Sequence, residues 1–166
     1  MTKLPPYNAY WVIPEKFMAG EYPGHRYNEE QTPLRLDALL EAGISTFIDL
    51  TEPHERVPYE PVLRERAGYY EVNFQYQRFS IGDYGIPSAE GMRTILDTLH
   101  KALTEGRTPY IHCWAGMGRT GTAVGCYLVE KGLSGAEALL KVDQLCYYAP
   151  SPQTKEQKDF VRNWKK

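Results

Sequence analysis

Residues 109–120 read Pro-Tyr-Ile-His-Cys-Trp-Ala-Gly-Met-Gly-Arg-Thr, and this stretch decides how the whole chain is interpreted. Pro109 to His112 is short and apolar, as expected of a buried strand, and Arg119 to Glu130 has the apolar content of a buried helix. Cys113 and Arg119 therefore stand at the two ends of a tight loop between a strand and a helix. A loop of this length can turn its backbone N–H groups inward and bring both ends toward one bound anion.

The rest of the chain alternates strand-like and helical segments, which indicates an α/β fold with a largely parallel central sheet flanked by helices. We expect a hairpin formed by residues 11–13 and 17–19, strands at 44–50, 69–76 and 109–112, and helices at 32–43, 61–67, 88–106, 119–130, 134–146 and from 151 onward. No repeat, linker or low-complexity tract divides the sequence, so residues 1–166 are predicted to form a single domain.

Three loops of this predicted fold follow a strand and precede a helix, and their residues are 51–58, 77–87 and 113–118. Such loops emerge at the same edge of a parallel sheet, where ligands of open α/β sheets bind. We therefore expect Asp83 to lie at one rim with the cysteine loop. His54 and Arg56 belong to the same rim, either as substrate contacts or as a solvated charge cluster.

The composition is that of an ordinary globular protein, with 42% hydrophobic and 24% charged residues. A net charge of −2 argues against a nucleic-acid partner or a basic membrane-binding patch. The cysteines, Cys113, Cys126 and Cys146, suggest neither a disulfide framework nor a zinc site, and we expect no metal or other cofactor. Residues 1–6 lack the features of a signal peptide, and no segment has transmembrane length. We predict a cytoplasmic monomer.

The loop between Cys113 and Arg119 has the chemistry of a phosphate-ester cleaving site. A free thiol has a pKa of about 8.5, and a helix N-terminus, inward N–H groups and a nearby guanidinium all favour the nucleophilic thiolate. Gly116 and Gly118 permit positive φ angles and a close approach of the backbone to an anion. Arg119 can bind two phosphate oxygens at once.

The neighbouring residues have supporting roles in this interpretation. Thr120 can donate a hydrogen bond to the sulfur, and His112 can fix the loop from its base. The predicted phosphate-binding segment consists of Trp114, Ala115, Gly116, Met117, Gly118 and Arg119. The alternative is that Cys113 is a buried core residue and Arg119 an ordinary helix charge, but the complete pattern of residues favours a functional loop.

This run resembles the signature loop of the cysteine-dependent protein tyrosine phosphatase superfamily. Chain length and the position of the loop are similar to those of small, atypical dual-specificity phosphatases, and the resemblance extends over residues 47–160 with its strongest part at 112–129. It implies a phosphotyrosine protein phosphatase-like fold, a phosphocysteine intermediate, no metal, and a general acid on a separate loop.

Asp83 is the best candidate for that acid, because departure of an alkoxide or phenolate requires a proton. Residues 78–87 resemble the acid loop of the family, an aspartate followed by a proline, although Ser80 stands where many relatives have proline. Gly82 and Gly85 could act as hinges for a closing movement. An exposed turn aspartate is the alternative for Asp83, and Asp49 is a weaker rival because its place inside an apolar strand favours a structural carboxylate.

Residues 153–160 resemble the glutamine loop of the larger tyrosine-specific phosphatases, Gln-Thr-x-x-Gln-x-x-Phe. By that resemblance Gln153 would orient the water that hydrolyses the phosphocysteine, and Gln157 would support it. The alternative is a polar helix start with Phe160 in the core.

The resulting hypothesis is an enzyme that removes phosphate from phosphotyrosine in a protein or peptide, with phosphoserine and phosphothreonine as further candidates. The same mechanism would suit an inositol phosphate or phosphoinositide phosphatase. Relatives of that kind tend to carry lysine in the loop, whereas Trp114, Ala115 and Met117 are not basic. Rhodanese-like or arsenate reductase chemistry and a non-catalytic phosphotyrosine-binding module fit less well, because Cys113, Arg119 and a preceding acid are all present.

Overall fold

The computed structural model describes residues 8–24 and 29–165, so residues 1–6, on which the expected absence of a signal peptide rests, lie outside it. A five-stranded sheet has the order β1-β2-β5-β3-β4. The strands are β1 (Ala9–Ile13), β2 (Phe17–Gly20), β3 (Thr46–Asp49), β4 (Gln75–Arg78) and β5 (Pro109–His112). β1 pairs with β2 in antiparallel fashion, and the other neighbours pair in parallel, which confirms the largely parallel sheet.

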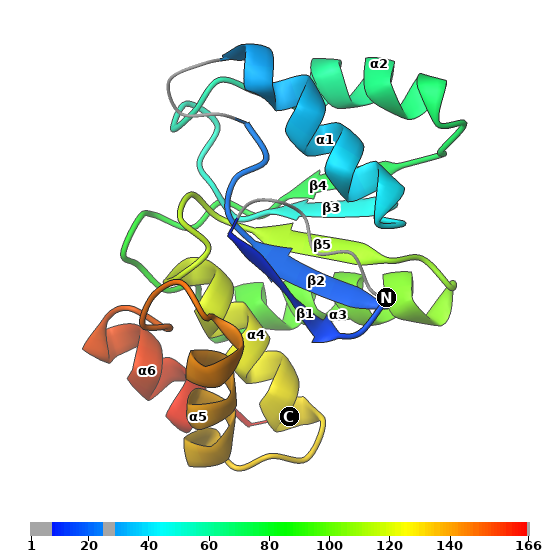
Figure 1. Ribbon diagram of the computed structural model, residues 1–166. Coiled ribbons are helices and arrows are strands. Elements are labelled where there is room, and N and C mark those ends of the chain that lie inside the picture. The colour runs from blue at the N-terminus through cyan, green and yellow to red at the C-terminus, as the bar shows by residue number, and fades with distance from the viewer. Residues whose placement is uncertain (1–7, 25–28, 166) are drawn as a thin grey trace.

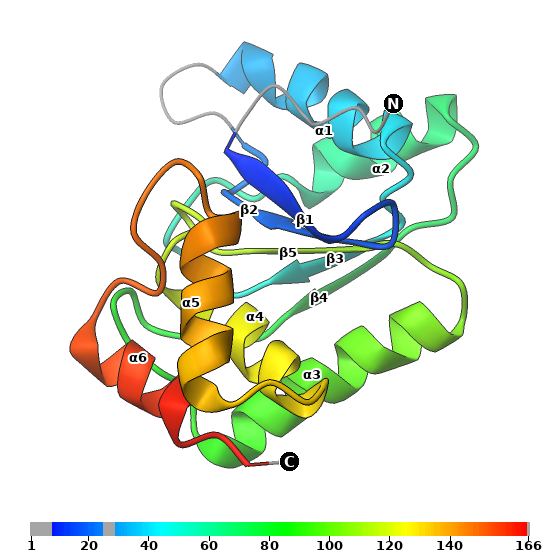
Figure 2. The same ribbon diagram turned by 60° about the horizontal axis from the view of Figure 1, so that its bottom comes forward.

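Helices cover both faces of the sheet, as predicted (Figure 1). They are α1 (Thr32–Glu41), α2 (Glu60–Tyr69), α3 (Ala89–Thr104), α4 (Arg119–Glu130), α5 (Gly135–Leu145) and α6 (Lys155–Arg162). α1 and α2 lie on one face and the remaining four on the other, so each face has its own hydrophobic core. Figure 2 shows α4 among α3, α5 and α6, against which it packs.

Several local predictions are confirmed. Ser88 Oγ accepts a hydrogen bond from the Gly91 backbone N–H at the start of α3, and Ser134 forms a capping box with Glu137 at the start of α5. The hairpin, β5 and α4 also have the expected positions. These elements carry strong local signals, namely caps and apolar runs bounded by glycine.

Three predicted boundaries are wrong. The strand expected at 69–76 begins only at Gln75, because α2 continues through Gly68 to Tyr69 and a turn follows in which Glu71 has a φ of 55°. The Thr32-Pro33 pair predicts Thr32 as the capping residue before the helix, but Thr32 is the first residue of α1 and Gln31 is its N-cap. The last helix begins at Lys155, not near residue 151, because Thr154 and Gln157 form its capping box.

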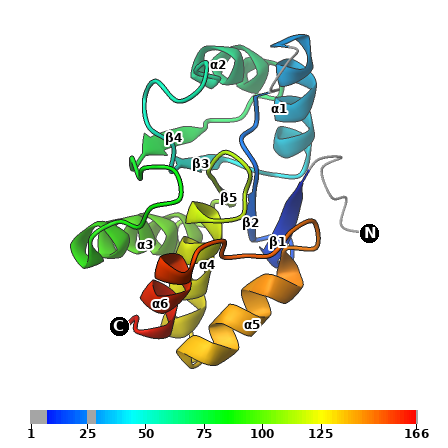
Figure 3. The ribbon, with the colours of Figure 1, turned by 90° about the vertical axis from the view of Figure 1, so that its left-hand side faces the viewer.

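The loops that follow β3, β4 and β5 meet at one edge of the sheet, which Figure 3 views directly. The loop between β5 and α4 lies between the other two in this view. Residues 119–127 at the start of α4 are all buried, so the helix that begins at this loop is anchored in the core. The fold therefore holds the cysteine loop rigidly and surrounds it with two neighbouring loops.

Candidate active site

The loop from Cys113 to Gly118 is held in place by hydrogen bonds that other segments donate to its carbonyl oxygens. Among the donors to them are the Tyr22 N–H to Trp114 O at 3.0 Å, the Tyr148 hydroxyl to Gly116 O at 2.9 Å and the Ser151 hydroxyl to Met117 O at 2.5 Å. The N–H groups of residues 115–118 donate to no group in the described part of the chain. Because the carbonyls are turned outward, these amides are available for an anion, and we call residues 113–118 the phosphate loop after their predicted role.

Gly116 and Gly118 are required for different reasons. Gly116 has a φ of 73°, and a Cβ there would lie 2.5 Å from the Gly20 carbonyl carbon, so both conformation and space demand glycine. Gly118 has a φ of −84°, which corrects the expected positive angle. Its requirement is space, since a Cβ would lie 2.9 Å from Gln157 Nε2.

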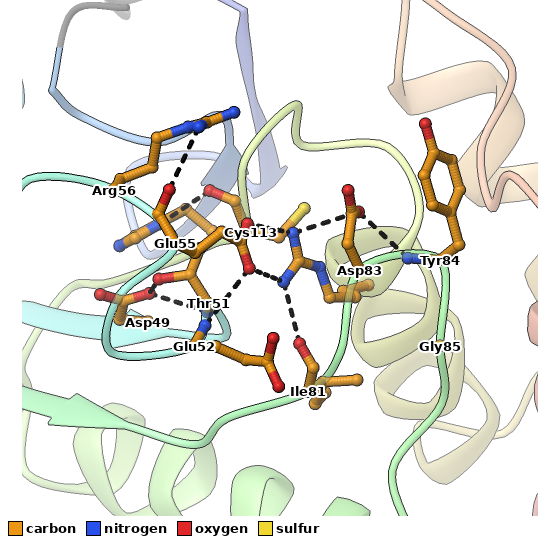
Figure 4. Close-up of polar contacts among 12 residues, drawn as sticks. Asp49, Thr51, Glu52, Glu55, Arg56, Ile81, Asp83, Tyr84, Gly85 and Cys113 are labelled. Atoms are coloured by element: carbon orange, nitrogen blue, oxygen red, sulfur yellow. Dashed lines mark hydrogen bonds and ion pairs between the residues drawn. The ribbon is translucent and has the colours of Figure 1, made fainter.

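Arg119 is the best-connected side chain of the site, and it is only 2% exposed. Its Nη1 and Nη2 donate to the two carboxylate oxygens of Glu55 at 2.8 and 2.7 Å, and Nη1 also donates to Ile81 O at 2.9 Å. Nη2 makes a longer contact of 3.3 Å with Asp83 Oδ1 (Figure 4). Burial opposes the charge, but the hydrogen bonds that Arg119 donates to Glu55 raise the pKa of Arg119 overall. The guanidinium is therefore fixed and fully charged.

Glu55 is the main residue that sequence reasoning missed. The prediction named His54 and Arg56 on either side of it, yet His54 is exposed and Glu55 makes the paired contact with Arg119. Burial alone would raise the pKa of Glu55, but the hydrogen bonds from Arg119 lower it overall. Because a buried arginine needs an acidic partner, the sequence could have indicated a glutamate in this loop. It could not have distinguished Glu55 from Glu52, which lies in the same loop.

Cys113 is 3% exposed and lies beside Arg119, whose pKa its sulfur contributes to raising. The predicted partner of its sulfur, Thr120, has a buried hydroxyl with no hydrogen-bond partner among the described residues. The donation from Thr120 to the sulfur therefore stays a prediction. Cys113 and Arg119, the candidates for nucleophile and phosphate-binding arginine, do lie together, as the sequence pattern indicated.

His112 supports the loop from below, as expected. Its Nδ1 lies 3.1 Å from Cys113 O and its Nε2 lies 2.7 Å from the Tyr59 hydroxyl. Burial lowers the pKa of His112, so the ring is neutral at pH 7. A carbonyl only accepts, so Nδ1 carries the proton and Tyr59 donates to Nε2. Sequence reasoning did not find Tyr59, which β3 and α2 bring under the loop.

Asp83 lies at the same site, as the topology predicted. Its side chain is 54% exposed, and besides Arg119 it accepts a hydrogen bond from the Tyr84 N–H at 3.0 Å. Tyr84 itself has a φ of 62°, a left-handed conformation that turns the chain immediately after the acid. Asp83 is therefore a surface carboxylate beside the buried guanidinium.

Gln157 ties three segments together. Its side chain is buried, its Oε1 accepts hydrogen bonds from the backbone N–H groups of Gln153 and Thr154 at 3.0 Å, and its Nε2 donates to Gly85 O at 3.2 Å. It thus joins the start of α6 to the loop that carries Asp83. Gln153 lies near Gly118, but its role in orienting water stays a prediction.

Asp49 is a structural carboxylate rather than a second acid. It is fully buried and accepts hydrogen bonds from the hydroxyls of Thr51 and Tyr76, both at 2.6 Å, and from Arg78 at 3.3 Å. Burial alone would raise its pKa, but the hydrogen bonds from Thr51 and Tyr76 lower it overall. Its ionised form is the one that the fold stabilises.

The hydrogen bonds that stabilise ionised Asp49 predict that Asp49→Asn destabilises the fold in a pH-dependent way. A carboxyl whose pKa is lowered by folding stabilises the protein fully above its unfolded pKa of about 3.9, and the contribution disappears as the pH falls through the folded value. We expect Asp49→Asn to lower the free energy of unfolding by about 2–3 kcal/mol at pH 7. The difference from wild type should shrink below about pH 4. Urea unfolding at several pH values measures it, with Asp97→Asn on the exposed side of α3 as the control. A difference that is constant with pH would contradict the assignment.

The other predicted cysteines pack in the core. Cys126 and Cys146 are buried, and burial raises the pKa of both thiols, which keeps them protonated. Within the residues that the structure describes, no cluster of three histidine, cysteine or acidic side chains could bind a metal ion. None of the described helices is both long and apolar enough to cross a membrane.

Comparison with known proteins agrees with this geometry. Residues 6–166 match the family model PTP-SAK, described as a Swiss Army Knife protein, DSP-PTPase phosphatase domain. The chain belongs to this phosphatase family. It is thus a small dual-specificity-like member of the cysteine phosphatase superfamily, and the resemblance seen in residues 112–129 is confirmed.

Individual relatives differ in their named substrates. The chain is 32% identical over 101 residues to mouse protein tyrosine phosphatase domain-containing protein 1, and spans 13% of it. It is 29% identical over 132 residues to Arabidopsis thaliana PTEN1, a phosphatidylinositol 3,4,5-trisphosphate 3-phosphatase and protein-tyrosine-phosphatase, and spans 30% of that protein. The structure of Tk-PTP in its active form shares the fold, with a TM-score of 0.77, 23% identity and 95% of each chain covered.

Proposed function

We propose that this phosphatase removes phosphate from phosphotyrosine in proteins or peptides, and secondarily from phosphoserine and phosphothreonine, through a phosphocysteine intermediate. The observation that carries the proposal is the convergence of Cys113, Arg119 and Asp83 on a phosphate loop whose amides face no protein partner. An amide cradle, a nucleophilic sulfur and a fixed guanidinium bind a phosphate monoester, and the adjacent carboxylate can protonate its leaving oxygen.

In the first step, the Cys113 sulfur attacks phosphorus and the bond from phosphorus to the tyrosine oxygen breaks. The loop amides and Arg119 stabilise the negative charge on the equatorial oxygens. A phosphate on Arg119 would take the Nη2 hydrogen that Asp83 accepts at 3.3 Å, whereas the shorter contacts with Glu55 remain. The released Asp83 carboxyl, once protonated, gives its proton to the departing phenolate.

In the second step, water attacks the phosphocysteine, Asp83 takes up a proton from the water, and the bond between sulfur and phosphorus breaks to regenerate the thiolate. Gln153 is proposed to orient the water. Gln157 supports this arrangement because it holds Gly85, two residues after Asp83, against the start of α6.

An inositol phosphate or phosphoinositide phosphatase is the second candidate, because the relative PTEN1 is named for such a substrate. Against it stands the character of the phosphate loop, whose variable positions are Trp114, Ala115 and Met117. A ring with several phosphates needs several cations around the site, so the apolar loop favours an aryl phosphate.

A turnover panel tests the substrate class. Phosphotyrosine, phosphoserine and phosphothreonine peptides and inositol phosphates are compared by kcat/KM, with Cys113→Ser as the blank. We expect phosphotyrosine peptides to exceed inositol phosphates by about tenfold or more. Faster turnover of inositol phosphates would overturn the proposal.

Asp83→Asn belongs in the same panel. It should lower kcat by about 10²–10³-fold on phosphotyrosine and by more on phosphoserine, because an alkoxide needs the proton more than a phenolate does. Equal losses on both substrates would argue against the acid role of Asp83.

A further inference from the structure

Arg56 and Trp114 form a stacked pair beside the phosphate loop. The guanidinium carbon of Arg56 lies 3.5 Å from the centroid of the indole ring, and both residues are half-buried. Stacking on an aromatic face suits the planar guanidinium and leaves its edge available for hydrogen bonds. The Arg56–Trp114 pair thus presents a positive charge in a defined orientation.

Most of the hydrogen-bonding capacity of Arg56 is unused. Its Nη1 donates to Glu55 O at 3.1 Å, and its Nε is buried without a partner. Arg56 forms no ion pair with any carboxylate of the described residues. The carboxylate of its chain neighbour, Glu55, is paired with Arg119 instead. The buried Nε is out of reach of a substrate, but Nη2 is not among the buried atoms and donates to no described residue, so an anion that reaches this edge of the guanidinium would be bound favourably.

The position of the pair follows from its chain neighbours. Arg56 comes directly after Glu55, which binds Arg119, and Trp114 comes directly after Cys113. Figure 4 shows Arg56 and Asp83 on opposite sides of Cys113. In this view the guanidinium of Arg56, stacked on Trp114, lies on the side of Cys113 away from the proposed acid.

Tyr22 fixes this arrangement. Its backbone N–H binds Trp114 O at 3.0 Å, its hydroxyl binds Val57 O at 2.6 Å, and its ring centroid lies 6.0 Å from that of Trp114. One tyrosine thus holds both the phosphate loop and the loop that carries Arg56. Little conformational entropy remains to be lost when Arg56 binds an anion.

We propose that Arg56, held on Trp114, is a specificity residue that binds the carboxylate of an acidic side chain next to the phosphotyrosine of a peptide substrate. This rests on the proposed function. The neighbouring cation Arg78 is already paired with Asp49. The Arg56–Trp114 pair therefore offers a single guanidinium, for one further anion. A carboxylate matches the two-pronged edge of that guanidinium, whereas a ring with several phosphates would find no additional cation in the phosphate loop.

The test compares three phosphotyrosine peptides that differ only in the residues flanking the tyrosine, which are glutamate, alanine or lysine. The measured quantity is the ratio of kcat/KM for the glutamate peptide to that for the alanine peptide. Wild type should prefer the glutamate peptide, and Arg56→Ala should lower the ratio about tenfold, the size of one charge-assisted hydrogen bond, mainly through KM. Higher salt should weaken the wild-type preference.

Two further variants separate a specific contact from a general charge effect. Arg56→Lys should retain part of the preference, because it keeps the charge but not the stacked fork. Arg64→Ala removes the same charge from the exposed, 70% accessible side chain on α2 and should leave the ratio at the wild-type value. A ratio that is the same in wild type and Arg56→Ala, or that falls equally in Arg64→Ala, overturns the inference while leaving the proposed function intact.

An inositol phosphate arm completes the design. If Arg56→Ala loses more on inositol phosphates than on the glutamate peptide, the second anion is a phosphate and the proposed carboxylate is wrong. If no phosphotyrosine peptide is turned over while p-nitrophenyl phosphate is hydrolysed in a Cys113-dependent manner, the proposed function fails and this inference fails with it.

Discussion

Cys113→Ser is expected to lower kcat on phosphotyrosine by roughly 10⁴-fold or more, the scale of losing a covalent nucleophile. The serine hydroxyl occupies the same place but does not ionise at neutral pH, so it is too weak a nucleophile to attack a phosphate bound by the amides and Arg119. Steady-state turnover measures the loss. Because those amides and Arg119 are retained, the variant should still bind a phosphotyrosine peptide in a calorimetric titration.

Cys126→Ala is the matched control for this substitution. Cys126 lies in the buried part of α4, and burial raises the pKa of its thiol, so it is a packing residue. Its replacement should cost stability while the folded enzyme keeps its kcat. Comparable turnover by Cys113→Ser and wild type would remove Cys113 from the mechanism, and loss of both turnover and peptide binding would point to a collapsed loop instead.

Arg119→Lys is expected to lower kcat/KM by about 10³-fold, although the positive charge is conserved. Arg119 holds both oxygens of Glu55 and the Ile81 carbonyl with two nitrogen atoms, and still has a hydrogen directed to Asp83. A lysine ammonium is a single point donor and cannot reproduce this geometry. It would either satisfy Glu55 or reach the phosphate.

The same variant should also be less stable. Glu55 is largely buried, its side chain being 15% exposed, and it would lose its paired partner. We expect the free energy of unfolding to fall by about 2 kcal/mol at pH 7, below the range for a fully buried broken pair because Glu55 retains some contact with water. Urea unfolding measures this fall, and the kinetic loss is measured on the folded variant.

Glu55→Gln separates the direct contact of Arg119 with phosphate from the effect of its ion pair with Glu55. Glutamine keeps the shape of the carboxylate and one acceptor, so the position of Arg119 is weakened while its direct contact with phosphate is retained. The kinetic loss should therefore be much smaller than that of Arg119→Lys. If Arg119→Lys stays within tenfold of wild type, or if Glu55→Gln has the larger effect, the phosphate-binding role of Arg119 is wrong.

Much of the fold could be predicted because its signals are local. The apolar run of β5, the apolar helix α4 and the capping residues Ser88 and Ser134 lie within a few positions of the elements that they define. The strand expected at 69–76 was wrong because only packing decides that α2 continues past Gly68. Gly68 is exposed, and a Cβ there would meet nothing within 4 Å, so the residue itself imposes no break.

The candidate site likewise contains residues that the sequence predicted and residues that only the tertiary structure identified. Cys113 and Arg119 are six residues apart, and parallel topology alone was enough to bring Asp83 to them. Glu55 could not be selected in advance, because the loop after β3 contains two glutamates and its sequence does not show which one faces Arg119. The pair formed by Arg56 and Trp114 was equally hidden, since 58 positions of chain separate two residues whose side chains stack.

By itself, the sequence determined the reaction class of this protein, because one short segment between a strand and a helix contains the proposed nucleophile, the amide cradle and the arginine proposed to bind phosphate. Only the tertiary structure decided how that arginine is held and which cation lies beside the site. The physical reason is that backbone conformation and loop chemistry depend on neighbours in the chain, whereas a buried charge takes its partner from whichever distant loop the packed sheet and helices place next to it.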